Sequence, residues 1–192
     1  DELVRVTSWS PATRTGTIAR GCVDTVPAAH VGTARMYFVE DGLAVDSTEY
    51  APSTTVQARL LTQTSSGVLD GAAAGTNSLV MARRSDRPYP PGRVRINGLE
   101  YPAEVYESIT VSWAHRDRKL QADQVIDTSQ ASIGPEPGTT YRLRIYSGTV
   151  LKRTYSGSTG TSKTYSADDE GADGGPFYPL RVVLDSERGG LY

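Results

Sequence analysis

Short stretches in which hydrophobic and polar residues alternate recur along the whole chain, separated by turn-forming residues. Successive side chains of a β-strand point to opposite faces, so this alternation predicts strands that bury one face. In the first part of the chain the predicted elements are a hairpin over residues 1–20, strands over 35–40, 56–64 and 77–84, an Asp41-Gly42 turn and a loop over 65–76. Val56, Ala58 and Leu60 are expected on one strand face, and Leu79 and Met81 on another.

A proline-rich connector interrupts this pattern near residues 85–91. Pro88, Pro90 and Pro91 prevent regular structure and stiffen an extended segment. We therefore expect two modules, residues 1–87 and residues 88–192. The first is predicted to be a small β-barrel or sandwich and the second a β-sandwich, so the predicted fold class is all-β.

The alternation also assigns a core and an outer face to the second module. His115 to Lys119 are expected where a strand runs into solvent, and Arg142 and Arg144 on an outer strand face. Gly189-Gly190 predicts a turn into a further strand, so we expect a fragment of a longer polypeptide whose last strand is truncated. The residues predicted to share the inner faces of three strands are Ile109, Val111 and Trp113, then Tyr141, Leu143 and Ile145, then Leu180, Val182 and Leu184.

Length, charge and cysteine content narrow the function classes. The 192 residues suit one large or two small β domains. Residues 1–87 hold eight basic and nine acidic side chains and residues 88–192 twelve and thirteen, whereas nucleic-acid binders usually show a basic excess. We expect no nucleic-acid partner, no targeting segment and no membrane span. Cys22 is the only cysteine, which excludes an intrachain disulfide, and its apolar neighbours predict a buried residue rather than a reactive thiol.

Residues 88–192 resemble a fibronectin type III domain. The likeness rests on the proline-rich start, a V-x-I strand, an I-x-V-x-W strand that ends at Trp113, and a Y-x-L-R-V strand that begins at Tyr178. Pro179 and Leu180 depart slightly from the usual Y-x-V-x-V pattern of that family. The resemblance implies that Trp113 fills the core of the sandwich.

A narrower resemblance involves both parts of the chain. V-S-W-A-H-R-D-R followed by I-G-P-E-P-G-T-T-Y-R-L-R is similar to a module of tail proteins from long-tailed bacteriophages and prophages. Residues 19–34 are similar to a segment that recurs in such proteins, with Arg20-Gly21, Asp24-Thr25, His30 and Gly32 as its pattern. The resemblance implies a piece of a tail-tip or baseplate protein in a virion tail, as part of a multimeric, often trimeric, hub.

Histidine positions do not define a catalytic or metal site. Ser112, His115 and Asp117 are close in sequence, but a catalytic triad is defined by spatial geometry, and on a strand Ser112 and His115 face opposite sides. His30 is expected to hydrogen-bond the backbone, because two histidines and one cysteine make a poor zinc set. We assign no catalytic, cofactor-binding or metal-binding residue.

The acidic, glycine-rich run of residues 168–175 is the strongest remaining candidate for a site. Oxygen ligands in such a loop bind calcium in other proteins, although the spacing does not match an EF-hand. A solvated loop is the simpler interpretation. Paired carboxylates for glycoside hydrolysis require a defined separation across a cleft, which sequence does not show, and we set that interpretation aside.

Arginine and tyrosine are the side chains most suited to recognition. Seventeen of the 20 basic residues are arginine, whose planar guanidinium pairs well with carboxylates at interfaces. The simpler interpretation is a solvated strand face with local ion pairs. Tyrosine is favoured at recognition surfaces but also fills cross-strand pairs. The residues concerned are Arg83, Arg84 and Arg87 at the junction, and Tyr37, Tyr146, Tyr155 and Tyr165, which are expected to face outward.

These patterns favour a non-enzymatic structural and interaction fragment of a phage tail protein. Its partners would be other tail subunits, or a receptor or glycan at the host surface. A carbohydrate-binding β-sandwich is the alternative, and a coplanar pair of exposed aromatic side chains would favour it. A hydrolase that uses Asp168, Asp169 or Ser112 is a third hypothesis, which requires a cleft with two carboxylates of shifted pKa.

Overall fold

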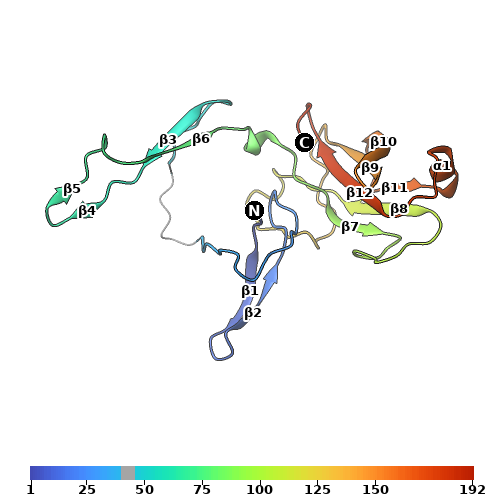
Figure 1. Ribbon diagram of the computed structural model, residues 1–192, viewed down its shortest axis with the longest axis horizontal. Helices are drawn as coiled ribbons and strands as arrows, with labels where there is room; N and C mark the ends of the chain where they lie inside the picture. Colours follow the sequence, from blue (N-terminus) through green and yellow to red (C-terminus); the bar gives the residue numbers. More distant parts are fainter. Residues whose placement is uncertain (40–45) are drawn as a thin grey trace. The chain divides into compact units, whose positions relative to one another are not determined.

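The computed structural model describes residues 1–39 and 46–192, and its regular structure consists almost entirely of short antiparallel strands (Figure 1). The predicted all-β class is therefore confirmed, and no closed barrel occurs within the described ranges. The predicted Asp41-Gly42 turn lies outside them. In chain order the elements are β1 (Arg5–Ser10), β2 (Thr15–Ala19), β3 (Thr55–Arg59), β4 (Gln63–Thr64), β5 (Gly67–Val68), β6 (Thr76–Val80), the 3-10 helix η1 (Arg84–Asp86), β7 (Gly92–Ile96), β8 (Ile109–Ala114), β9 (Thr140–Ser147), β10 (Val150–Ser158), β11 (Ser162–Tyr165), the helix α1 (Ala167–Ala172) and β12 (Leu180–Glu187).

The chain divides into two units. The sandwich unit comprises Asp1–Gly32 and Arg87–Tyr192, and the ribbon unit comprises Thr33–Asp86. The expected boundary near residue 87 is also a boundary between these units, but the first 32 residues join the sandwich. Backbone hydrogen bonds explain this grouping, because Val23 N–H donates to the Ile126 carbonyl at 3.1 Å and Thr128 N–H to the Arg20 carbonyl at 3.0 Å.

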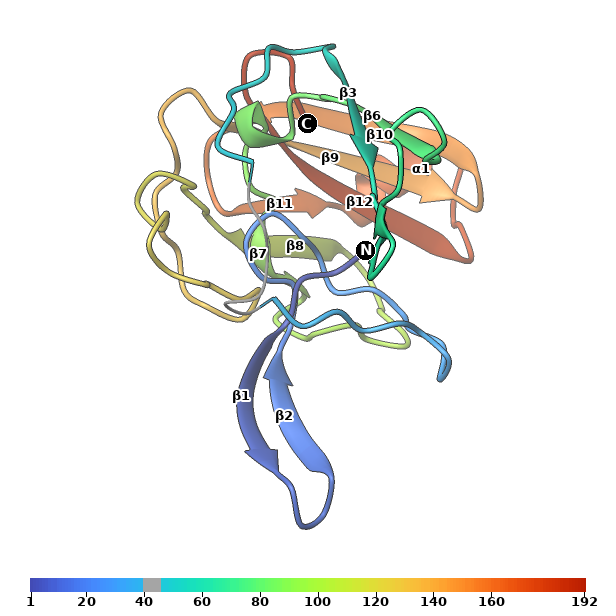
Figure 2. The same ribbon diagram turned by 90° about the vertical axis from the view of Figure 1, so that its left-hand side faces the viewer.

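Two three-stranded antiparallel sheets form the centre of the sandwich unit (Figure 2). One sheet has the order β11-β8-β7 and the other has the order β10-β9-β12. All three predicted inner faces are confirmed, since their residues form the core or pack against it. Trp113 is 5% exposed, and its ring centroid lies 5.3 Å from that of Tyr141 in the opposite sheet. Cys22 is fully buried, as predicted.

A tight turn and a projecting hairpin complete the sandwich unit. Asn97 and Gly98 both have positive φ, 50° and 81°, as the central residues of a type I′ turn require. The predicted hairpin over residues 1–20 is confirmed as β1 and β2, which extend away from the two sheets in both views (Figures 1 and 2).

The ribbon unit is built from two-stranded pairs, β3 with β6 and β4 with β5. The single strand predicted over 56–64 is interrupted, because β3 ends at Arg59 and β4 begins at Gln63. The strand predicted over 35–40 is wrong for its described part, since residues 35–39 adopt no strand. Alternating aromatic and apolar residues favour a strand, but a strand also needs a neighbour to accept its backbone hydrogen bonds.

Candidate interaction site

Residues 19–34 and the first residues of the chain are held together around one carboxylate, that of Glu2. The side chain of Glu2 is fully covered and accepts hydrogen bonds from Arg20 Nε at 3.0 Å and the backbone N–H of Gly21 at 2.9 Å. It also lies 2.7 Å from His30 Nε2 and accepts the N–H of Ala28 at 3.1 Å. Burial opposes its ionisation, but these hydrogen bonds prevail and hold the pKa of Glu2 well below its usual range. The expectation that His30 bonds the backbone is therefore wrong.

Gly21 is required by this arrangement. Its φ is +56°, and a Cβ at this position would lie 2.6 Å from Pro27 Cδ. Both conditions disfavour any side chain. The pattern Arg20-Gly21 with His30 thus has a structural role, which is to anchor the start of the chain against the loop that follows β2.

A buried arginine organises the long loop between β8 and β9. Arg116 is 5% exposed, although residues 115–119 were expected to run into solvent. That expectation is wrong because the guanidinium finds enough acceptors in the loop to replace water. Burial lowers the pKa of Arg116 from its ordinary value. The guanidinium donates to five backbone carbonyls, those of His115, Asp127, Thr128, Gln130 and Ala131, at 2.8–3.3 Å.

An ion pair with a buried carboxylate holds the far end of the same loop. Glu136 is 1% exposed and accepts from Arg118 Nε at 2.9 Å and 3.1 Å. Arg188 Nε lies 3.3 Å from the same carboxylate. The charged groups of this region therefore fasten the loop to the sheet ends.

The Ser112, His115 and Asp117 side chains have separate partners. His115 Nδ1 lies 2.7 Å from the hydroxyl of buried Tyr141, and burial lowers the pKa of His115. Asp117 Oδ1 accepts the backbone N–H of Lys119 at 2.8 Å. Within residues 1–39 and 46–192 no hydrogen bond joins any two of the three side chains, so the model does not bring them together as a triad.

The acidic run forms the short helix α1 rather than the expected open loop. Ser166 caps its start, and the Asp169 side chain accepts the Ser166 N–H in return. Arg153 pairs with Asp169 at 2.8 Å and with Asp173 at 2.8 Å. Tyr155 donates to Asp169 at 2.8 Å. Where the structure is described, no group of three or more His, Cys, Asp or Glu side chains is placed to hold a metal ion.

An arginine and tyrosine ladder covers the outer face of β9 and β12. Arg142 and Arg144 both donate to Asp185, at 3.2 Å and 2.7 Å, on the face predicted for them. Arg181 lies 4.2 Å from the ring centroid of Tyr146. Of the tyrosines expected to face outward, Tyr37 is 77% exposed, whereas Tyr155 and Tyr146 are half-buried. Tyr165 was expected outward and is 1% exposed, because its ring fills the core while its hydroxyl reaches Asp173 at 3.0 Å.

A small open pocket lies at the edge of the β7 sheet. Its volume of about 230 Å³ is below the roughly 300–1,000 Å³ typical of small-molecule sites. It is lined by Arg20, Pro27, Arg93, Val94, Glu100, Tyr101 and Thr128.

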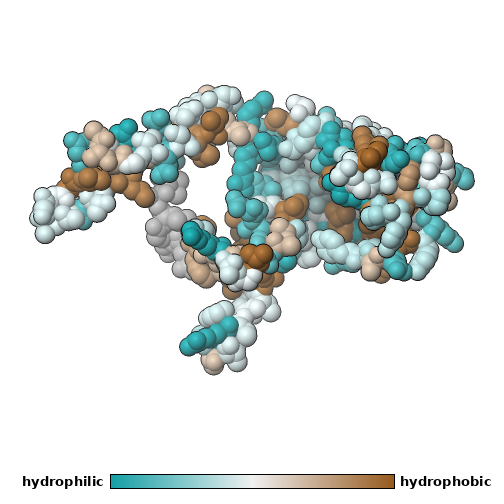
Figure 3. Space-filling model, viewed as in Figure 1, coloured by the Kyte–Doolittle hydropathy of each residue, from teal (hydrophilic) through white to brown (hydrophobic). Residues whose placement is uncertain are grey.

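Apolar residues are exposed along the ribbon unit (Figure 3). Val56 and Leu79 lie opposite each other in the β3–β6 pair, and Leu79 is 66% exposed. Within the described part of this unit, Ala74 is the only buried hydrophobic residue. We define the ribbon surface as the exposed apolar residues in and next to the β3–β6 and β4–β5 pairs, which are Leu60, Leu61, Val68, Leu69, Leu79 and Val80.

A second apolar surface lies on the projecting hairpin. Val6 and Ile18 are directly opposite in the β1–β2 pair and are 48% and 46% exposed. Trp9 is 61% exposed on the same hairpin. Sequence reasoning missed both surfaces because alternation reports that a strand has an apolar face, but not whether anything covers that face.

The fold and these surfaces define an all-β protein of the β-sandwich-like class with exposed apolar ribbons. No protein-family model matches the chain, and no curated protein matches it. None of the helices in the described ranges has the length and apolar character that crossing a membrane requires.

Proposed function

We propose that this chain is a non-enzymatic structural and interaction component of the tail tip of a long-tailed bacteriophage or prophage. The observation that carries the assembly role is the ribbon surface. A two-stranded ribbon is marginally stable in water by itself, and large exposed apolar patches mark protein–protein contact sites. The ribbon unit therefore gains its stability from a partner surface.

The tail is proposed as the site of that assembly because of the two sequence resemblances. The packing of two antiparallel sheets around buried Trp113 supports the fibronectin-like part of the resemblance. The sandwich acts as a rigid carrier, and the ribbon unit and hairpin contact neighbouring tail subunits or the host surface. In the virion several copies surround a hub, which is trimeric in the proposed arrangement.

The pairing of charged side chains supports a structural rather than catalytic role. Arg116 donates to backbone carbonyls of the β8–β9 loop, and Glu136 accepts a hydrogen bond from Arg118 of the same loop. Asp169, which the hydrolase hypothesis needs as a reactive carboxylate, is paired with Arg153. The proposed function therefore uses these charges to hold loops rather than to transform a substrate.

Site-specific cross-linking in assembled particles tests the proposal. A photo-reactive amino acid replaces Leu79 on the ribbon surface, and a matched variant carries it at neighbouring Ser78, whose side chain points to the other ribbon face. The Leu79 probe is expected to cross-link to a second tail polypeptide much more strongly than the Ser78 probe. Recovery of the chain only outside tail particles, by antibody labelling and mass spectrometry, would overturn the proposal.

A further inference from the structure

The pocket at the edge of the β7 sheet combines charged, hydroxyl and aromatic side chains. Its volume of about 230 Å³ is too small for a drug-sized ligand, which fills about 300–1,000 Å³, but it suits a single ring. Two arginines, a carboxylate, a tyrosine and a threonine line it beside two apolar residues. All of these residues belong to the sandwich unit.

One positive charge in this pocket is uncompensated. Arg20 is paired with Glu2, and Glu100 is paired with Arg95 Nη2 at 3.0 Å. Within residues 1–39 and 46–192 the guanidinium of Arg93 has no ion-pair or hydrogen-bond partner, and this residue is exposed. The pocket therefore favours a ligand with a single negative charge over a ligand with none or with two.

The backbone of β7 directs Arg93 to the pocket. The register of β7 with β8 shifts between Gly92 and Arg95, so β7 holds an extra residue there, and bulges of this kind re-aim a side chain. The φ angles of Arg93 and Tyr101, 49° and 48°, lie in the left-handed region that residues other than glycine rarely adopt. Such backbone strain is concentrated at functional sites in proteins, and here it occurs at two residues of one pocket.

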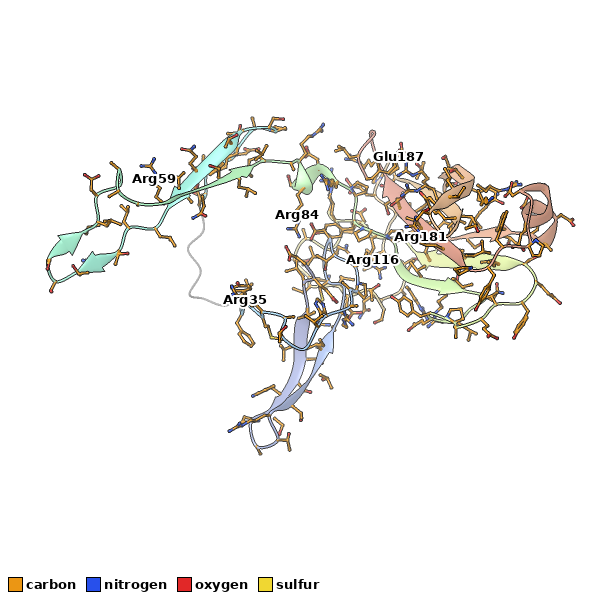
Figure 4. All side chains as sticks on the ribbon, in the orientation of Figure 1. Arg35, Arg59, Arg84, Arg116, Arg181 and Glu187 are labelled. Atoms are coloured by element: carbon orange, nitrogen blue, oxygen red, sulfur yellow. The ribbon has the colours of Figure 1, made fainter. Side chains whose placement is uncertain are left out.

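The part of the pocket formed by Thr128 is held from inside the sandwich unit. The Thr128 carbonyl accepts the Arg93 N–H at 2.6 Å and Arg116 Nη2 at 3.3 Å. The side chain of Arg116 is buried within this unit (Figure 4). The hydroxyl of Thr128 forms no hydrogen bond in the part of the chain that the structure describes, so it is available to a ligand.

We propose that this pocket binds one uronic acid unit at the end of a glycan. The guanidinium of Arg93 binds the sugar carboxylate, and the ring of Tyr101, which is 83% exposed, packs on the apolar face of the sugar. The Thr128 hydroxyl and Glu100 Oε2 accept hydrogen bonds from sugar hydroxyls, since Arg95 bonds only Oε1 of Glu100.

The ligand class follows from the carboxylate inside the pocket. Glu100 needs a ligand that donates hydrogen bonds, and it repels the second charge of a phosphate monoester. An acidic peptide side chain supplies one carboxylate but no sugar ring for Tyr101 and no hydroxyl groups for Glu100. The proposal rests on the sandwich unit alone, and it depends neither on the ribbon surface nor on assembly in a tail.

An NMR titration of the isotope-labelled 192-residue chain with methyl β-D-glucuronide tests the proposal. The amides of residues 93–101 and of Thr128 are expected to shift with saturable binding. Methyl β-D-glucoside lacks the carboxylate, and acetyl-glutamate amide carries a carboxylate without the sugar ring. Each is expected to bind at least about tenfold more weakly than the glucuronide. Glucose 6-phosphate, with its second charge, is also expected to bind more weakly.

Two matched pairs of variants test the assigned roles. Arg93→Gln is expected to weaken glucuronide binding at least about tenfold. Its control is Arg181→Gln, which removes an arginine of β12 that also lacks an ion-pair partner among the described residues but lies outside the pocket (Figure 4). Tyr101→Ala is expected to weaken binding about threefold to tenfold. Its control is Tyr106→Ala, which removes a ring that is 77% exposed in the same loop.

All four variants are expected to unfold cooperatively in urea like the wild type, because each changes an exposed side chain. Both controls are expected to bind the glucuronide as the wild type does. The proposal would be overturned by equal binding of the glucuronide and the glucoside, or by equal binding of the glucuronide and acetyl-glutamate amide. Tighter binding of glucose 6-phosphate, unchanged binding to Arg93→Gln, or no glucuronide binding to the folded chain would also overturn it.

Discussion

Replacing Arg116 by methionine is expected to destabilise the sandwich unit by about 2 kcal/mol. Two of its five acceptors, the carbonyls of Gln130 and Ala131, have no other hydrogen-bond donor among the described residues. An acceptor left unpaired costs about 1–3 kcal/mol. Both residues lie at the surface, so water replaces part of the bonding and the lower end of about 1 kcal/mol applies to each carbonyl.

The assay is urea unfolding followed by tryptophan fluorescence. A Trp9→Phe background leaves buried Trp113 as the only reporter, since the chain has two tryptophans. The matched control is Arg142→Met, which breaks a partly exposed ion pair with Asp185 and is expected to cost less than about 1 kcal/mol. Equal and small losses for both variants would refute the view that Arg116 holds the β8–β9 loop in place.

Three further changes have defined outcomes. Gly92→Ala is expected to lower the free energy of unfolding by about 1–3 kcal/mol, because a Cβ at this position would lie 2.0 Å from the guanidinium of buried Arg116. Gly160→Ala, in the same unit and with nothing within 4 Å of its Cβ, is expected to be near neutral in the same urea assay. Folding lowers the pKa of Glu2 below its ordinary value of 4.5. The free energy of unfolding of the wild type is therefore expected to exceed that of Glu2→Gln by its full amount above pH 4.5, and this difference is expected to shrink as the pH falls further. A difference that does not change with pH would contradict this. Burial is the main cause, and the hydrogen bond to Asp169 the second, that raise the pKa of Tyr155 to about 12. Asp169→Asn is therefore expected to lower the pKa of Tyr155 in an NMR titration. An unchanged pKa would show that the carboxylate contributes nothing.

The strands that form the sandwich could be predicted because local pattern and tertiary burial agree there. In β8 and β9 every second residue is buried. The opposite sheet packs against the strand face that the alternation predicts to be apolar. The Asn97-Gly98 turn could be predicted for a similar reason, since positive φ is a property of the two residues themselves.

The anchoring charges could not be predicted, because their partners are distant in sequence. Glu2 meets Arg20 and His30 across 18 and 28 positions, and nothing in the local sequence of the first residues indicates a carboxylate that accepts several hydrogen bonds. Arg116 was misjudged for the same reason, since a run of charged residues normally indicates a solvated segment and its acceptors are backbone carbonyls that any sequence supplies.

The sequence pattern also could not predict that some apolar residues would be exposed. Residues 35–39 have the composition of a strand, yet they pair with no strand in the described structure. Leu79 lies at an alternating apolar position typical of a core residue, yet it is exposed. A pattern of apolar residues predicts that a face will be buried, but it does not say whether the covering surface belongs to the same chain.

The need of the ribbon unit for a partner is tested most directly by hydrogen exchange of the isolated 192-residue chain at a concentration where it is monomeric. Amides of β3 and β6 are expected to exchange within seconds, while those of β8 and β9 remain protected through global unfolding. Protection of β3 and β6 equal to that of β8 and β9 in the monomer would contradict the proposal, because the ribbon unit would then be stable without any partner.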